Sequence, residues 1–114
     1  MAYQALVVDD SSIARSSLIK MLRLSGIPFD DIYQADNGIS GLRMLDQHAV
    51  DLVFTDINMP EMDGIAFVDI LAERHIPKHI PIVVLSAQGS ETSVAKLRRL
   101  GIRGYIRKPC TPEA

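Results

Sequence analysis

The sequence ALVVDD at residues 5–10 joins a short apolar run to two carboxylates, Asp9 and Asp10. A second run, LVFTD at residues 52–56, ends in the same way at Asp56. A short β-branched run that ends in an acid is typical of a buried strand, which delivers its last side chain to one edge of a sheet. If the two strands are parallel neighbours, all three acids meet at that edge. Such crowding favours either protonation or a bound cation, so the cluster is a candidate metal site and chemical centre.

Short apolar runs alternate along the chain with longer segments of helical periodicity. The expected strands are Ala5–Val8, Asp31–Ala35, Leu52–Thr55, Ile82–Leu85 and Gly104–Ile106. The expected helices follow Ser11 and Ser12, contain Ile39, start at Asp63-Gly64, and start at Ser90; the first stops at Gly26 and the last at Gly101. This alternation predicts a parallel sheet with helices on both faces. In such sheets, ligands bind beyond the carboxyl ends of the strands, where the three acids lie.

The last residues of the sequence resemble the start of another helix. Thr111 is well placed as its N-cap and Pro112 as its first helical residue, but only two residues follow. We therefore expect residues 1–114 to form a single domain whose fifth helix is truncated or missing after residue 111. One face of the sheet should then expose apolar residues, which usually mark a partner surface or a liability.

Composition narrows the class of protein. The chain has 114 residues, of which 47% are hydrophobic and 23% charged, which is ordinary for one globular domain. A net charge of -2 gives no reason to expect direct nucleic-acid binding. The single cysteine, Cys110, excludes an internal disulfide and suits the cytoplasm. No apolar run is long enough for a secretory signal or a membrane span, so we expect a cytoplasmic protein without membrane contact.

Other polar residues also stand at or just beyond the ends of expected strands. They are Asn58 and Asp63-Gly64 in the segment INMPEMDG that follows Asp56, Ser86-Ala87 after the fourth strand, and Lys108-Pro109 after the fifth. In this order and spacing, the motifs resemble the receiver domain of two-component response regulators, the family that includes the chemotaxis regulator. The resemblance extends from Leu6 to Pro112. It implies a flavodoxin-like, doubly wound α/β fold whose five parallel strands have the order 2-1-3-4-5.

The resemblance implies phosphoryl transfer to a carboxylate, in which catalysis is mostly positioning and neutralisation of charge. Asp56 is the implied nucleophile, which forms an acyl phosphate. The implied cofactor is Mg²⁺ or Mn²⁺, a hard cation that prefers oxygen ligands. Asp10 and Asp56 would bind it directly, Asp9 directly or through water, and Asn58 through its main-chain carbonyl.

Further residues are implied to hold the phosphoryl group and respond to it. Lys108 would pair with the phosphoryl oxygens as a point charge. The Ser86 hydroxyl and the backbone N–H groups of Asn58 and Ala87 would donate hydrogen bonds to them. Tyr105 is the implied switch residue, whose ring turns inward when Ser86 moves toward the new dianion and so shifts the equilibrium between two conformations.

The implied function is that of a signalling phosphoacceptor. The phosphoryl group would come from the phosphohistidine of a sensor histidine kinase or of a histidine phosphotransfer protein. Its arrival would switch a surface that binds a downstream output domain or protein. Slow autodephosphorylation would reset the domain, which thus acts on itself rather than as a turnover enzyme.

Three alternatives remain open from the sequence. A flavin-binding module of the same fold would need a phosphate loop rich in Ser, Thr or Gly after the first strand, where Asp9 and Asp10 would repel a phosphate unless a metal intervened. A metal-dependent phosphatase usually carries a second acid two residues after its nucleophile on the first strand, where this chain has Ser11 or Ser12. A receiver-like pseudo-domain would only bind partners, and the complete set of motif residues argues against it.

Overall fold

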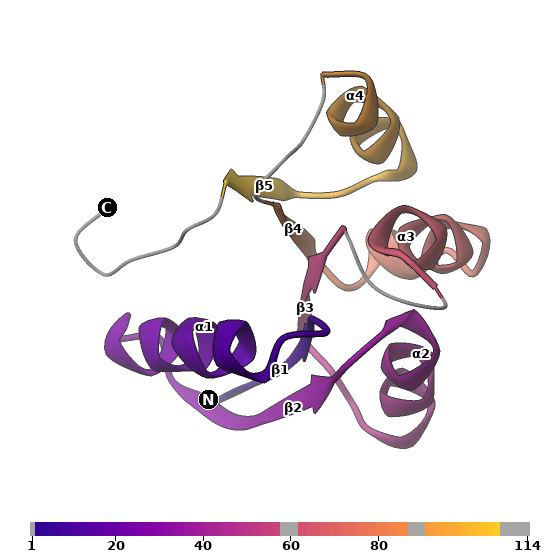
Figure 1. Ribbon diagram of the computed structural model, residues 1–114. Coiled ribbons are helices and arrows are strands. Elements are labelled where there is room, and N and C mark those ends of the chain that lie inside the picture. Colours follow the sequence, from indigo (N-terminus) through magenta and orange to yellow (C-terminus); the bar gives the residue numbers. More distant parts are fainter. Residues whose placement is uncertain (1, 58–61, 87–90, 108–114) are drawn as a thin grey trace.

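The computed structural model describes residues 2–57, 62–86 and 91–107, and the following account concerns these residues. They form five strands, four α-helices and one short 3₁₀ helix in alternating order (Figure 1). The strands are β1 (Tyr3–Val8), β2 (Phe29–Ala35), β3 (Leu52–Asp56), β4 (Ile82–Ser86) and β5 (Gly104–Arg107). The helices are α1 (Ser12–Leu24), α2 (Gly38–Gln47), α3 (Gly64–Glu73), the 3₁₀ helix η1 (Ile76–Lys78) and α4 (Glu91–Leu100).

The five strands form one parallel sheet in the order β2-β1-β3-β4-β5. The predicted flavodoxin-like strand order is thereby confirmed. The chain passes outward from β1 to β2 in one direction and then continues through β3, β4 and β5 in the other. The boundary between β1 and β3 is therefore the topological switch point, where open α/β sheets form their ligand crevice.

Helices cover both faces of the sheet, α1 on one and α2, α3 and α4 on the other (Figure 1). Alternate residues of β1 serve the two layers: Leu6 and Val8 face the core under α2, α3 and α4, whereas Ala5 and Val7 face the core under α1. All four are at most 1% exposed. A strand buried on both faces must be apolar throughout, which explains the continuous run at the start of the sequence.

The face that carries α1 also exposes part of β5. Ile106 is 40% exposed there, while Leu85 of the neighbouring β4 and Phe54 of β3 are buried. The expected fifth helix falls on residues 108–114, which lie outside the described residues. None of the helices in the described ranges is both long enough and apolar enough to cross a membrane.

Side-chain caps define the helix starts. Ser11, Asn37 and Asp63 each accept a hydrogen bond from a backbone N–H in the first turn of α1, α2 and α3, respectively. The predicted starts of the first and third helices are thus confirmed. Gly26 and Gly101 follow α1 and α4 with φ angles of 85° and 104°, which side chains rarely tolerate, and so mark the predicted stops.

Loss of the α3 cap should have a measurable cost. Asp63→Ala is expected to lower the free energy of unfolding by about 1 kcal/mol, because the Ala66 N–H loses an acceptor. The Ala66 nitrogen and Oδ1 of Asp63 lie 2.8 Å apart in the native chain. Asp63→Ser keeps a capping oxygen and should recover most of the loss in equilibrium urea unfolding. An equal loss in both variants would exclude the cap as the cause.

Candidate functional site

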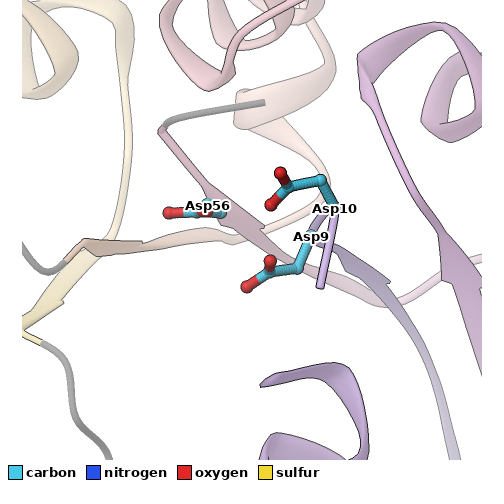
Figure 2. A group of neighbouring side chains, drawn as sticks. All are labelled: Asp9, Asp10 and Asp56. Carbon is cyan, nitrogen blue, oxygen red and sulfur yellow. The ribbon is translucent and has the colours of Figure 1, made fainter. Parts of the chain in front are cut away.

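Three carboxylates meet at the carboxyl ends of β1 and β3 (Figure 2). The two strands are parallel neighbours, and Val8 pairs with Thr55, so the residues that follow them stand side by side. One carboxylate oxygen from each of Asp9, Asp10 and Asp56 lies within 4.8 Å of the others. The prediction that the three acids meet at one edge of the sheet is confirmed.

The acids differ in exposure. Asp9 and Asp56 are only 6% and 7% exposed, whereas Asp10 is exposed. Burial of a carboxylate is costly unless a hydrogen bond or a cation compensates its charge. Two buried acids beside a third therefore make a strong demand for positive charge at this point.

Local hydrogen bonds hold two of these carboxylates in place. The Ser11 N–H donates to Oδ1 of Asp9 at 3.0 Å, and the Ile57 N–H donates to Oδ1 of Asp56 at 2.8 Å. Both donors lie in the loop that follows the strand, so each strand end turns its own side chain toward the cluster. The carboxylates are thus pre-oriented by backbone close in sequence.

The donor set fits a hard divalent cation. Carboxylate oxygens are the ligands that Mg²⁺ and Mn²⁺ select, and Mg²⁺ usually takes one or two carboxylates and keeps several waters. The exposure of Asp10 leaves the cluster open to solvent, as a site that retains waters requires. The fit rests on the chemistry and spacing of the three acids alone.

Ser86 and Tyr105 come from the two strands beyond β3. Asp56 pairs with Leu85, so Ser86 extends one residue farther along the same edge, and its side chain is fully buried. Tyr105 pairs with Val84 and is half-buried against the core under α2, α3 and α4. Because side chains alternate along a strand, Tyr105 lies on the same face of the sheet as Val84 and Ser86.

Three residues of the predicted site, Asn58, Ala87 and Lys108, lie outside the described residues. Their roles at the acid cluster remain predictions. The described part of the site consists of the three acids, Ser86 and, farther from the edge, Tyr105.

Gly64 lies in close contact with the backbone of Asp56 and Ile57. Its N–H donates to the Ile57 carbonyl at 2.6 Å, and a Cβ atom there would overlap the Asp56 carbonyl and lie 2.7 Å from the Ile57 Cα. The first turn of α3 can therefore approach the end of β3 only because residue 64 is glycine. The Asp-Gly pair at residues 63–64 predicted the start of a helix, but not this close approach.

Arg15 was not singled out from the sequence, although it reaches the acid cluster. Its guanidinium donates to the main-chain carbonyl of Asp9 and to the side chain of Gln34 in β2. An arginine five residues after an acid pair, in the first turns of the following helix, is the only signal that sequence offers for it.

Comparison with known proteins agrees with this fold. Residues 5–114 match the family model of the response regulator receiver domain. The chain is 37% identical to the chemotaxis protein CheY1 of Helicobacter pylori strain J99 over 109 residues, which are 95% of this chain and 86% of that protein. It is 35% identical to CheY-3 of Vibrio cholerae over 106 residues, 93% of this chain and 80% of the relative.

Solved structures give the same picture. CheY4 of Vibrio cholerae superposes with a TM-score of 0.85 at 27% identity, over 99% of this chain and 92% of that one. A chain of the CheX–CheY–BeF3–Mg²⁺ complex of Borrelia burgdorferi superposes with a TM-score of 0.85 at 28% identity, over 97% of this chain and 81% of that one. The likeness spans nearly the whole chain in both cases.

Proposed function

Because this chain belongs to the response regulator receiver domain family, we propose that it is a signalling phosphoacceptor whose phosphorylated residue is Asp56. The observation that carries the proposal is the cluster of three acids, in which Asp56 is buried and held by the Ile57 N–H. A buried carboxylate beside two others is poorly suited to a purely structural role. It is well suited to react with phosphorus when a cation offsets the charge.

The reaction transfers a phosphoryl group from an oxygen or nitrogen atom of the donor to a carboxylate oxygen of Asp56. A carboxylate oxygen of Asp56 attacks the phosphorus of the donor and forms a P–O bond, while the bond from phosphorus to the leaving group breaks and its electron pair leaves with that group. With acetyl phosphate, the products are the Asp56 acyl phosphate and acetate. To end the signal, water attacks the same phosphorus and the bond to the Asp56 oxygen breaks. The products are inorganic phosphate and the free carboxylate.

The cation in this proposal is Mg²⁺, or Mn²⁺ in its place. Asp10 and Asp56 would hold it directly, Asp9 directly or through water, and Asn58 through its carbonyl. When bound, it supplies positive charge that offsets the three carboxylates and the entering phosphoryl oxygens. The similarity to a CheY chain described in complex with BeF3 and Mg²⁺ supports this assignment.

Residues from two other strand ends would hold the phosphoryl group. The Ser86 hydroxyl donates to one phosphoryl oxygen, and the ammonium group of Lys108 pairs with another. The backbone N–H groups of Asn58 and Ala87 complete the set of donors. Preorganised donors of this kind lower the barrier because they need not reorient as charge develops.

Tyr105 would transmit the change to the surface. Its position on the face of the sheet shared with Ser86 lets it fill space that Ser86 vacates. Tyr105→Ala should still accept the phosphoryl group, but phosphorylation should then shift the backbone amide NMR signals of α4 and β5 less than in the wild type. Tyr105→Phe, which keeps the ring, should respond like the wild type. If phosphorylation shifts these signals as much in Tyr105→Ala as in the wild type, Tyr105 is not the switch residue.

The partners in this proposal are a sensor histidine kinase or a histidine phosphotransfer protein upstream, and an output domain or protein downstream. A chain of the CheX–CheY complex of Borrelia burgdorferi is similar to this one over 97% of this chain and 81% of that one, which supports a partner-binding surface. Two-component phosphotransfer of this type takes place in the cytoplasm, where we place the protein.

The test is a mass measurement. The chain is incubated with Mg²⁺ and acetyl phosphate, and its intact mass should rise by one phosphoryl group. An excess of EDTA should suppress the gain, and addition of Mn²⁺ should restore it. A well-folded chain that gains no mass under these conditions would be a partner-binding pseudo-domain instead.

A further inference from the structure

Arg15 of α1 connects Asp9, the residue after β1, to Gln34 of β2. Its Nη1 donates to the main-chain carbonyl of Asp9 at 2.5 Å, and its Nε donates to Oε1 of Gln34 at 3.0 Å. Gln34 belongs to β2 and pairs with Val7 of β1. The planar guanidinium has donors in a fixed fork, so it can satisfy a backbone acceptor and a side-chain acceptor at once.

The bond to Asp9 acts on a residue already held at other points. The Asp9 N–H donates to the Ala35 carbonyl at 3.0 Å, and its carboxylate accepts from the Ser11 N–H. The Asp9 carbonyl is also part of the peptide that joins Asp9 to Asp10. Because a peptide unit is planar, a hydrogen bond that fixes this carbonyl also orients the N and Cα atoms of Asp10.

We infer that Arg15 is a positioning residue that holds the Asp9–Asp10 peptide in the orientation required for cation binding. The inference rests on the proposed function, since it concerns the same acid cluster. The acceptors of Arg15 are the Asp9 carbonyl and the Gln34 side chain, not a carboxylate of the cluster. It acts through the backbone of two ligands, and Gln34 acts through Arg15. Groups that orient ligands in this way commonly change metal affinity by about 10-fold or more when removed.

A purely electrostatic role for Arg15 would have the opposite effect on the affinity for Mg²⁺. A cation close to three carboxylates competes with Mg²⁺, so its removal would tighten Mg²⁺ binding. Its replacement by lysine, which keeps the charge, would then change nothing. Positioning predicts instead that lysine fails, because a single ammonium point charge cannot reproduce the planar fork that serves both acceptors.

The experiment titrates the chain with MgCl₂ by calorimetry and compares dissociation constants. Arg15→Lys and Arg15→Ala are both expected to weaken Mg²⁺ binding by about 10-fold. Gln34→Ala, at an exposed position of β2, keeps Arg15 but removes its second acceptor, and should weaken binding by a smaller factor. This variant tests the inference even if the arginine variants fold poorly.

Arg23 provides the matched control. It lies on the same helix and also donates to main-chain carbonyls, those of Phe29 at 2.6 Å and Asp30 at 3.1 Å, but at the opposite end of α1. Arg23→Lys should lower the unfolding midpoint in the absence of Mg²⁺ about as much as Arg15→Lys does, yet leave the Mg²⁺ dissociation constant unchanged. A merely structural role for Arg15 would make the two variants behave alike in both measurements.

The outcomes separate this inference from the proposed function. Wild-type or tighter Mg²⁺ binding by folded Arg15→Lys and Arg15→Ala overturns the positioning role and leaves the phosphoacceptor proposal standing. A wild-type chain that binds no Mg²⁺ overturns both.

Discussion

Asp56→Asn is expected to abolish the gain of one phosphoryl group on incubation with Mg²⁺ and acetyl phosphate. The amide of asparagine is almost the same size as the carboxylate and keeps an oxygen that can accept from the Ile57 N–H, 2.8 Å away in the native chain. It lacks the anionic oxygen that attacks phosphorus, so a loss of more than about 100-fold is expected when the nucleophile is removed. Intact mass spectrometry measures the result.

The same substitution should leave the fold intact. It removes one of three crowded negative charges, so the midpoint of thermal unfolding without Mg²⁺ should rise or stay unchanged. Asp30→Asn is the control, because Asp30 is an exposed carboxylate on β2, away from the acid cluster. It should accept a phosphoryl group at the wild-type rate. Phosphorylation of Asp56→Asn at wild-type levels would assign the reaction to another residue.

Gly64→Ala is expected to lower the free energy of unfolding by about 3 kcal/mol or more. The added Cβ would overlap the Asp56 carbonyl and lie 2.7 Å from the Ile57 Cα. These are backbone atoms of β3 and its loop, and they cannot rotate aside as a flexible side chain can. The substitution must therefore push α3 away from the sheet or displace the residue proposed to carry the phosphoryl group.

Gly104→Ala offers a matched comparison in the same sheet. Among the described residues, a Cβ at residue 104 would meet only the Val83 side chain, at 3.6 Å, which is ordinary van der Waals contact. Its effect on stability should stay within about 1 kcal/mol of zero. Equilibrium urea unfolding measures both variants, and similar values for the two would show that α3 has room to move. Where Gly64→Ala remains folded, its rate of phosphorylation should also fall.

The layout of the sheet was readable from sequence because it depends on short-range patterns. The run from Ala5 to Val8 is apolar at every position, as a strand covered on both faces must be, and the three acids follow directly from parallel pairing of β1 with β3. The starts of α1 and α3 could be predicted for the same reason, since the side chains of Ser11 and Asp63 each accept from an N–H only three residues away.

The boundary of β2 was less well predicted. The strand begins at Phe29, two residues before the expected start, although the acidic pair Asp30-Asp31 has low strand propensity. Both acids are exposed, and β2 is an edge strand, so neither has to enter the core. The position of these residues on an edge strand therefore outweighs their low strand propensity.

Contacts between distant segments were beyond the reach of sequence patterns. His48 is half-buried, and the centroid of its ring is stacked 4.0 Å from that of Tyr33. The bonds from Arg15 to Asp9 and Gln34 likewise require that β2 lie beside β1. Such contacts depend on how whole elements pack, which no local spacing encodes.

The edge strand β2 bears on how copies of the chain behave at high concentration. An open strand edge offers N–H and C=O groups on which another chain can add a strand, which is a route to aggregation. Here Asp30 and Asp31 place charge on that edge, and the Arg23 guanidinium donates hydrogen bonds to the carbonyls of Phe29 and Asp30. An incoming strand would have to displace a charge-assisted contact and bury carboxylates at the same time. Edge-to-edge association through β2 is therefore disfavoured, and the sheet can remain monomeric along this side.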